Sequence, residues 1–211
     1  KIKMKNNNVK ITTPKGIAQY PWLTTADTKF SEIGEFKTNL ILGKSEAQSI
    51  AQAIDKAYAD SITLAKEKAK GKKVKEADKP YFDEVDDKGN PTGNVIFKFK
   101  CKAKVTTKNG DTFDNKPAIF DAQGKPMQNV NVWGGSQIKV SAELIPYYTQ
   151  MVGAGISMRL RAAQVIELVE GGSNSEGYGF KKEDGYVHTT ETKSEELSNE
   201  TKTQVSTEDD F

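Results

Sequence analysis

Four lysines alternate with apolar residues in segment 96–105, which reads Ile-Phe-Lys-Phe-Lys-Cys-Lys-Ala-Lys-Val. Successive side chains of a β-strand point to opposite faces, so Lys98, Lys100, Lys102 and Lys104 would line one face. Their ammonium groups would stand about 6.6 to 6.8 Å apart, close to the phosphate spacing of an extended single strand. This basic row predicts a binding site for a polyanion. The alternative interpretation is an ordinary strand face exposed to solvent.

Arg159 and Arg161 alternate with apolar residues in the same way, and with Lys139 they form a second candidate basic row. The charge distribution supports an anionic partner. Residues 1–170 hold 27 Lys and Arg against 19 Asp and Glu, whereas residues 171–211 hold 4 against 10. A basic body attracts polyanions, and an acidic tail can fold back over the same surface or bind a basic partner.

Aromatic side chains near strand ends are candidates for base stacking. Proteins that bind single strands without sequence preference add such platforms to a basic groove. Adjacent tyrosines on a strand point to opposite sides, so Tyr147 and Tyr148 cannot both be buried in a strand covered on one face. Burial in the core is the alternative for each ring, since aromatic residues dominate small cores. The candidates are Tyr20, Trp22, Tyr81, Phe82, Trp133, Tyr147 and Tyr148.

Other chemistries find little support. Cys101 and His188 are the only cysteine and histidine, so Cys and His ligands cannot complete a zinc site and no intrachain disulfide can form. His188 has no plausible Ser or Cys partner for acyl transfer. We expect no enzymatic activity, no metal and no cofactor. The alternative is a magnesium-dependent nuclease that uses the acidic cluster, although this cluster is more typical of a solvated turn. It consists of Asp83, Glu84, Asp86 and Asp87.

One helix and several strands must position these residues. Residues 45–70 are expected to form an amphipathic helix, because isoleucine or tyrosine recurs every fourth residue and Ser45 with Gln48 makes a capping box. Residues 71–80 are expected to be a flexible basic loop. Several antiparallel strands with one inserted helix indicate a small β-barrel or β-sandwich, and the periodicity alone does not decide between the two folds. The expected strands are Val9–Thr12, Ile17–Tyr20, Phe36–Leu42, Val95–Val105, a piece near Phe113 or Ala118–Phe120, Ile138–Leu144 and Ser157–Leu168.

The two ends of the chain give further expectations. From Thr189 onward there is too little apolar surface to offset the entropy of ordering, so disorder is expected. No apolar run approaches the roughly 18 residues that span a bilayer. Residues 1–10 are too polar for a signal peptide. We therefore expect a protein without a membrane segment, in a reducing compartment.

Several short motifs, in order and spacing, resemble the single-stranded DNA-binding proteins of short-tailed bacteriophages. The match runs in register from Val95 to Val187 and returns at the terminal Phe211, and KPYF at 79–82 matches more loosely. The motifs are FKFKC at 97–101, FDAQGKPM at 120–127, GGSQIKV at 134–140, IPYY at 145–148, VGAGISMRL at 152–160 and GYV at 185–187.

The resemblance implies a mainly β OB-fold, a five-stranded Greek-key barrel with an inserted helix, over residues 1–188, followed by a disordered acidic tail over residues 189–211. It implies non-catalytic, sequence-independent binding of single-stranded DNA in phage replication, recombination, repair and strand annealing, in the cytoplasm of the infected bacterial host. It also implies a homodimer. An OB-type binder of RNA or of an anionic polysaccharide is a further alternative.

The resemblance also assigns roles to single residues. Lys100 and Lys102 would touch the DNA backbone, and Tyr147 would be the leading stacking residue. The tail, ending in Glu208, Asp209, Asp210 and Phe211, would compete with DNA for the basic groove and contact the phage DNA polymerase and helicase-primase, with Phe211 as the anchor. The full set of expected DNA-binding residues is Lys98, Lys100, Lys102, Lys104, Lys139, Arg159, Arg161, Tyr147, Tyr148 and Trp22.

Overall fold

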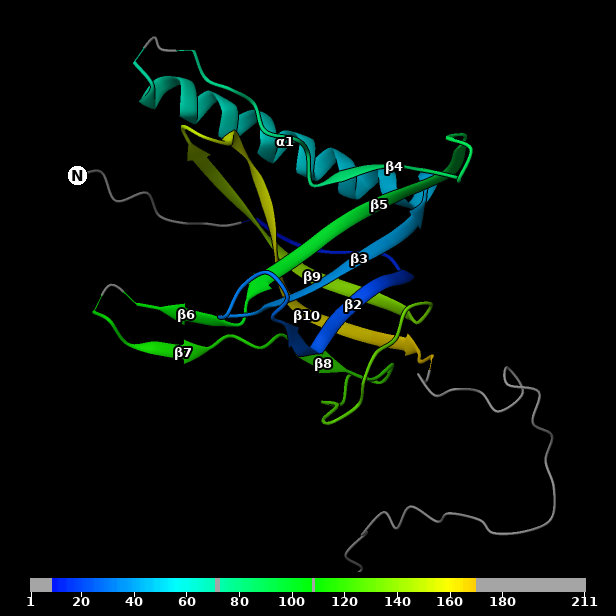
Figure 1. The fold of residues 1–211 in the computed structure, drawn as a ribbon. Coiled ribbons are helices and arrows are strands. Elements are labelled where there is room, and N and C mark those ends of the chain that lie inside the picture. Colours follow the sequence, from blue (N-terminus) through cyan, green and yellow to red (C-terminus); the bar gives the residue numbers. More distant parts are fainter. Residues whose placement is uncertain (1–8, 71–72, 108, 170–211) are drawn as a thin grey trace, which may run out of the picture. The chain divides into compact units, whose positions relative to one another are not determined.

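In residues 9–70, 73–107 and 109–169, which the computed structural model describes, the chain forms ten strands and one helix (Figure 1). Most of the long strands show alternating burial, because apolar residues at every second position face a common core. The elements are β1 (Val9–Thr12), β2 (Gly16–Asp27), β3 (Glu35–Gly43), α1 (Lys44–Lys68), β4 (Tyr81–Val85), β5 (Pro91–Lys102), β6 (Lys104–Thr106), β7 (Thr112–Asp114), β8 (Ala118–Phe120), β9 (Gln137–Thr149) and β10 (Gly153–Glu167).

Five strands close into a barrel in the order β2–β3–β5–β10–β9, with β9 pairing back to β2. The pairs are antiparallel except β5 with β10, which run parallel with Arg159 opposite Lys100. A Cβ at Gly16 would lie 2.6 Å from the carbonyl oxygen of Ile41, so only glycine fits where β2 meets β9. The expected five-stranded Greek-key barrel is confirmed. β1, β4 and β8 extend its sheet.

The barrel interior is filled by aromatic and branched side chains. Phe97 and Phe99 of β5 are fully buried, which confirms that the apolar half of the alternating segment 96–105 enters the core. The other large side chains with almost no exposure come from β2, β3, α1, β9 and β10, and they are Leu23, Leu40, Leu42, Ile54, Ile138, Val140, Leu144, Met158 and Leu160. This core holds the outward-facing side chains of the same strands at fixed positions.

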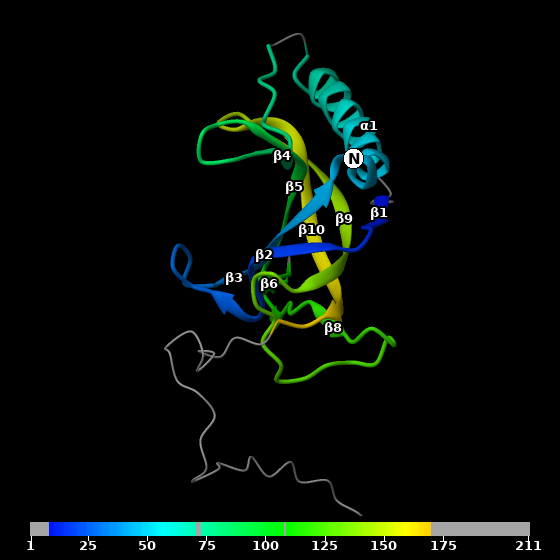
Figure 2. The ribbon, with the colours of Figure 1, turned by 90° about the vertical axis from the view of Figure 1, so that its right-hand side faces the viewer.

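Helix α1 connects β3 to the segment before β4 and lies beside the β9–β10 hairpin (Figures 1 and 2). It buries the expected apolar face, including Ile50, Ile54 and Ile62. The expected capping box is wrong. The N-cap is Gly43 in an extended conformation without a side-chain cap, so Ser45 already lies inside the first turn. The helix is not long and apolar enough to cross a membrane.

The region after α1 also differs from the expected flexible loop. Val74 and Ala77 are buried, and the Ala77 N–H donates to the Ala154 carbonyl at 2.8 Å. The Ala154 N–H in turn donates to the Lys75 carbonyl at 2.9 Å. This segment is therefore held against the start of β10 by backbone hydrogen bonds.

Strand β4 was not expected from the sequence, because its residues show no alternating pattern. They are mostly exposed, since β4 pairs only with β5 and lies outside the barrel.

The expected strand at residues 95–105 is interrupted. β5 ends at Lys102, Ala103 forms a bend, and Lys104 begins β6, which pairs with β7 in a separate two-stranded sheet. Both candidate pieces in the following segment are strands, β7 and β8. The expected domain boundary at residues 188 and 189 and the expected disordered tail lie outside the described residues.

Candidate nucleic-acid interface

The lysines of β5 face away from the core, as the alternation predicts. Lys98, Lys100 and Lys102 are exposed, whereas Phe97, Phe99 and Cys101 between them are buried. Lys104 is also exposed but belongs to β6, so the fourth lysine of the expected row leaves the barrel strand. The reason is the bend at Ala103, whose N–H donates to the Gly34 carbonyl at 2.9 Å.

A second line of side chains runs across the strands rather than along β5. Trp22 of β2 lies opposite Lys37 of β3, which lies opposite Lys100 of β5, which lies opposite Arg159 of β10. Neighbouring strands are about 4.8 Å apart, so these side chains are close neighbours on the outer face. We call Trp22, Lys37, Lys100 and Arg159 the cross-strand row.

Carboxylates accompany the cations of this row. Glu35 Oε1 lies 3.3 Å from Lys100 Nζ, and Asp27 Oδ2 lies 2.5 Å from Lys37 Nζ. The hydrogen bond from Lys37, followed by one from the Lys29 backbone N–H, lowers the pKa of the Asp27 carboxyl. Lys98 instead lies over the Phe82 ring, 4.6 Å from its centroid.

Glu143 of β9 serves two arginines at once. Its Oε2 lies 3.7 Å from Arg159 Nη1 and its Oε1 lies 3.6 Å from Arg161 Nε. The Glu143 side chain is only 15% exposed, whereas those of Arg159 and Arg161 are about half exposed. Arg161 lies in a bulge of β10, between the registers of Leu160 and Ala162, and a bulge re-aims side chains. The carboxylate therefore sits beneath two guanidinium groups that remain open to a ligand.

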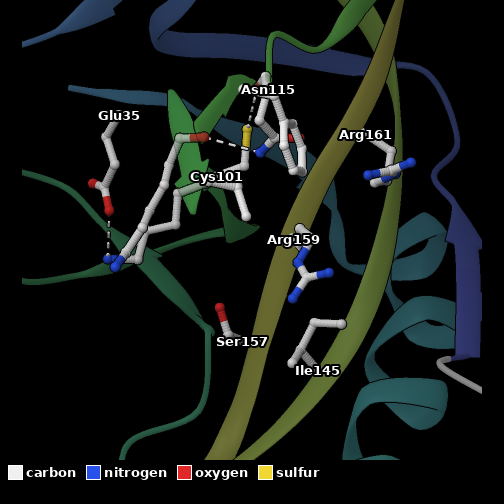
Figure 3. A pocket seen from close by; sticks show the side chains of 11 residues that line it. Glu35, Cys101, Asn115, Ile145, Ser157, Arg159 and Arg161 are labelled. Carbon is white, nitrogen blue, oxygen red and sulfur yellow. Dashed lines mark hydrogen bonds and ion pairs between the residues drawn. The ribbon is translucent and has the colours of Figure 1, made fainter. Parts of the chain in front are cut away.

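An open hollow of about 500 Å³ brings many of these groups together. Figure 3 shows Glu35 on one side of it and Arg159 and Arg161 on the other. Burial raises the pKa of the Cys101 thiol to about 11, so this cysteine is not a reactive group of the site. We call this the basic hollow, and its lining residues are Glu35, Lys100, Cys101, Lys102, Val105, Phe113, Asn115, Ile145, Ser157, Arg159 and Arg161.

Trp22 borders a second hollow of about 460 Å³ at the β2–β3 end of the cross-strand row. β2 is irregular between Gln19 and Trp22, and Tyr20 has a φ of 50°. This irregularity inverts the alternation, so Leu23 enters the core and Trp22 stays 42% exposed. We call it the aromatic hollow, and it is lined by Tyr20, Trp22, Asp27, Lys29, Phe30, Lys37, Thr38 and Asn39.

The structure does not bring Lys139 to the same place as the two arginines. Lys139 lies on β9 opposite Gln164 and lines a different hollow, together with Thr12 and Phe120. The second basic row of the sequence analysis is therefore divided between two hollows. Its arginines join Lys100 and Lys102, and Lys139 does not.

The two tyrosines lie near the tip of the β9–β10 hairpin. Tyr147 is opposite Gly155, and Tyr148 is opposite Ala154. A Cβ at Gly155 would lie 2.8 Å from Tyr147 Oη and 2.9 Å from its Cζ, so the half-buried ring lies against this glycine. Tyr148 is 36% exposed. Of the expected stacking residues, neither tyrosine lines the basic hollow.

The acidic cluster of the nuclease alternative spans the end of β4, with Asp83 and Glu84, and the turn that joins β4 to β5, with Asp86 and Asp87. Asp86 accepts hydrogen bonds from the backbone N–H of Asn90 at 2.8 Å, from the side chain of Asn90 and from the backbone N–H of Lys88 at 2.9 Å, and these bonds lower the pKa of its carboxyl. Glu84 accepts bonds from Thr92 and Asn94. Within the described part of the chain, no three His, Cys, Asp or Glu residues are grouped so as to hold a metal ion. The cluster therefore shapes a hairpin.

Several residues of the two hollows were not among the candidates expected from the sequence. Lys37 could have been found, because it alternates with buried Phe36 and Thr38 in an expected strand. Phe30 and Phe113 do not alternate with buried residues in this way, so no sequence pattern marks them as site residues. They are 85% and 51% exposed, and only the fold places Phe30 in the aromatic hollow and Phe113 in the basic hollow.

A family model and several solved structures match this chain. The family model described as the single-stranded DNA-binding protein of bacteriophage T7 matches residues 15–168. The chain is similar to the crystal structure of gp2.5, a single-stranded DNA-binding protein encoded by bacteriophage T7, with a TM-score of 0.68 and 27% identity, covering 86% of this chain and 100% of that chain. No curated protein sequence matches the chain.

A more distant likeness concerns the fold alone. The single-stranded DNA-binding protein of bacteriophage Enc34, solved in complex with single-stranded DNA, has a TM-score of 0.53 and 16% identity, covering 76% of this chain and 88% of that chain. The T7 family model, by contrast, spans all five barrel strands and α1. The chain therefore belongs to the family of the single-stranded DNA-binding protein of bacteriophage T7.

Proposed function

We propose that this chain binds single-stranded DNA without sequence preference through the basic hollow. It acts as a non-catalytic protein in phage DNA replication, recombination, repair and strand annealing, in the cytoplasm of the infected host cell. The observation that carries the proposal is the convergence of Lys100, Lys102, Arg159 and Arg161 on one open hollow. Their formal charge of +4 exceeds the −2 of the two carboxylates beside them, Glu35 in the lining and Glu143 beneath the arginines, so the hollow favours a polyanion.

The cross-strand row suggests the direction of the bound strand. Phosphates would contact Arg159, Lys100 and Lys37 in turn, and the strand would reach the aromatic hollow at Trp22. There Tyr20 and Phe30 offer exposed rings next to Lys29. A positive groove with aromatic platforms is the usual arrangement for sequence-independent binding of single strands.

Salt titration of DNA binding tests the proposal. Each phosphate contact to a single strand contributes about 0.7 to the slope of log affinity against log salt concentration. Replacing Lys100 and Lys102 together by alanine should weaken binding to oligo-dT and reduce the slope by about 1.4. The matched control replaces Lys56 on α1 and Lys88 in the β4–β5 turn, which changes the net charge equally and lies outside both hollows. An unchanged slope in the first variant, or the same loss in the control, contradicts the assignment.

Competition separates the remaining alternatives. Oligo-dT, oligo-U and heparin are compared as competitors for a labelled oligo-dT strand. The proposal requires oligo-dT to compete best. A preference for oligo-U or heparin would instead support an RNA or polysaccharide ligand. Magnesium-dependent cleavage of DNA that is lost in Asp86→Asn would support the nuclease.

The acidic end of the chain is proposed to contact the phage DNA polymerase and helicase-primase and to compete with DNA for the basic hollow. Residues Glu208, Asp209, Asp210 and Phe211 would make this contact. Deleting them should abolish association with the polymerase and leave DNA affinity equal or higher. Weaker DNA binding after the deletion would overturn this role. The proposed homodimer is tested separately by sedimentation of the free protein.

A further inference from the structure

The β6–β7 hairpin stands outside the barrel as a sheet of its own (Figure 1). It has three residue pairs, in which Val105 lies opposite Phe113. Two-stranded hairpins are at best marginally stable by themselves, and three or more strands or a packed helix are normally needed. Val105 and Phe113 are cross-strand neighbours and form one apolar face. Phe113 is nevertheless 51% exposed.

The root of the hairpin is fixed to the barrel. The Asn115 N–H donates to the Ala103 carbonyl at 2.8 Å, and Asn115 Nδ2 donates to the Lys102 carbonyl at 2.9 Å. The Ala103 N–H donates to the Gly34 carbonyl at 2.9 Å. These bonds set the direction in which the hairpin leaves the end of β5. As a result, both Val105 and Phe113 line the basic hollow.

The chemistry of the hollow defines what can cover this apolar face. Four cationic side chains and one carboxylate share the hollow with Phe113 and Val105. An uncharged apolar peptide would leave the cations unmatched, and a free phosphate would leave the ring exposed. A nucleotide of a single strand offers a planar apolar base and an anionic phosphate a short distance apart, so it complements both groups.

We infer that the β6–β7 hairpin is an arm that holds one base of the bound strand, with Phe113 stacked on the base and Val105 beside it. The neighbouring phosphates pair with Lys102 and the guanidinium groups of β10. This inference rests on the proposed function, because it concerns the same hollow. It adds a base-contacting residue on an element outside the barrel.

The experiment separates contacts to bases from contacts to phosphates. Binding of Phe113→Ala to oligo-dT is compared with binding to an abasic oligonucleotide of the same length and phosphate number, at one salt concentration. Loss of a stacked base should weaken oligo-dT binding on the order of 5- to 20-fold. Binding to the abasic strand should change less than about 2-fold, because it offers no base.

Three further variants provide the controls. Phe113→Trp keeps a stacking ring and should retain oligo-dT affinity, whereas Phe113→Leu keeps apolar volume without a ring and should lose most of it. Thr112→Ala changes the adjacent residue, whose hydroxyl pairs with that of Thr106 at 3.0 Å and which does not line the hollow. It should bind like the parent.

Three results would overturn the inference. Equal loss of both oligonucleotides in Phe113→Ala would show that the ring acts on the phosphates or on the fold, and Phe113→Leu would then show the same equal loss. Unchanged oligo-dT affinity would show that the arm holds no base. If Phe113→Ala sedimented differently from the parent in the absence of DNA but bound oligo-dT with unchanged affinity, the apolar face of Val105 and Phe113 would be a contact with a second copy of this chain. If the parent itself fails to bind oligo-dT, the proposed function fails instead.

Discussion

The outer face of β9 and β10 runs from α1 to the basic hollow, and its two ends differ in how their aromatic side chains are covered. At the α1 end, the Tyr147 ring lies against Gly155, and Tyr58 Oη donates to the Ala77 carbonyl at 2.6 Å. The segment before β4 closes this end through backbone bonds to Ala154. At the hairpin end, Phe113 lies half exposed beside the cations of the basic hollow.

This difference separates residues that hold the fold from residues that are free to bind. An aromatic side chain on the outer face of a strand has two possible uses, and the neighbouring elements decide between them. At the α1 end, Tyr58 and Tyr147 already contact other protein groups, so changes to these two residues should act mainly on stability. The hairpin end leaves its ring open, so changes there should act mainly on binding.

Adding one methyl group at the closed end should have the largest effect on stability. Gly153 has a φ of 106°, and a Cβ would lie 2.5 Å from the Lys75 carbonyl oxygen. Gly153→Ala combines backbone strain with a steric clash, so the free energy of unfolding should fall by about 3 kcal/mol. Urea unfolding at equilibrium measures this fall.

The hairpin end offers a matched control for that change. Gly110 has a φ of 94°, but nothing lies within 4 Å of an added Cβ. Gly110→Ala should therefore cost about 1 kcal/mol or less, restricted to the hairpin. A similar loss of stability in both glycine variants would remove the distinction between a closed and an open end.

Removing an aromatic ring should lower the free energy of unfolding more at the closed end than at the open end. Tyr147→Ala should lower the free energy of unfolding by about 2 kcal/mol, since it empties the space against Gly155. Phe113→Ala should stay within about 0.5 kcal/mol of the parent, because its ring has little protein to pack against. Thermal and urea unfolding of both variants give the comparison. A stable Tyr147→Ala protein with weakened DNA binding would place Tyr147 with the open end as a stacking residue.

Glu143→Gln should change the DNA affinity of the open end, because Glu143 pairs with Arg159 and Arg161. The carboxylate competes with phosphate for Arg159 and Arg161, so its neutralisation should strengthen oligo-dT binding by about 3- to 10-fold at low salt. Screening should reduce the gain at high salt. Glu67→Gln on the exposed surface of α1 makes the same charge change and should have little effect. Weaker binding of Glu143→Gln would instead assign Glu143 the task of positioning the arginines for phosphate.

The smallest effect on stability is expected at Asp27, which pairs with Lys37 of the cross-strand row. Because its pKa is lowered in the folded protein, it contributes stability above its unfolded pKa of about 3.9. This contribution is lost as pH falls through the folded pKa. The difference in unfolding free energy between the parent and Asp27→Asn should therefore shrink below about pH 4. Urea unfolding at pH 7, 4 and 2.5 tests this, and a pH-independent difference would contradict it.

Much of the fold followed from local pattern. Alternation located β1, β3, β8, most of β10, the first halves of β2 and β9 and residues 95–102 of β5, but it missed residues 21–27 of β2. Fourfold recurrence located α1 to within two residues at each end. Resemblance supplied the closed OB-type barrel, which the strand pairing confirms. The core face of β5 and the exposure of Lys98, Lys100 and Lys102 were also predicted correctly, because burial of Phe97 and Phe99 leaves those lysines no other side.

The composition of the candidate site could not be reached in this way. The pairing of Lys37 with Lys100 and of Lys100 with Arg159 depends on the register between strands far apart in the chain. The irregularity at Tyr20 turns Trp22 outward, and the bend at Ala103 moves Lys104 and Phe113 into a separate hairpin. Alternation is a property of one strand and its backbone. Register, bulges and the exposure of a ring arise from contacts between strands, so they appear only when the barrel has closed.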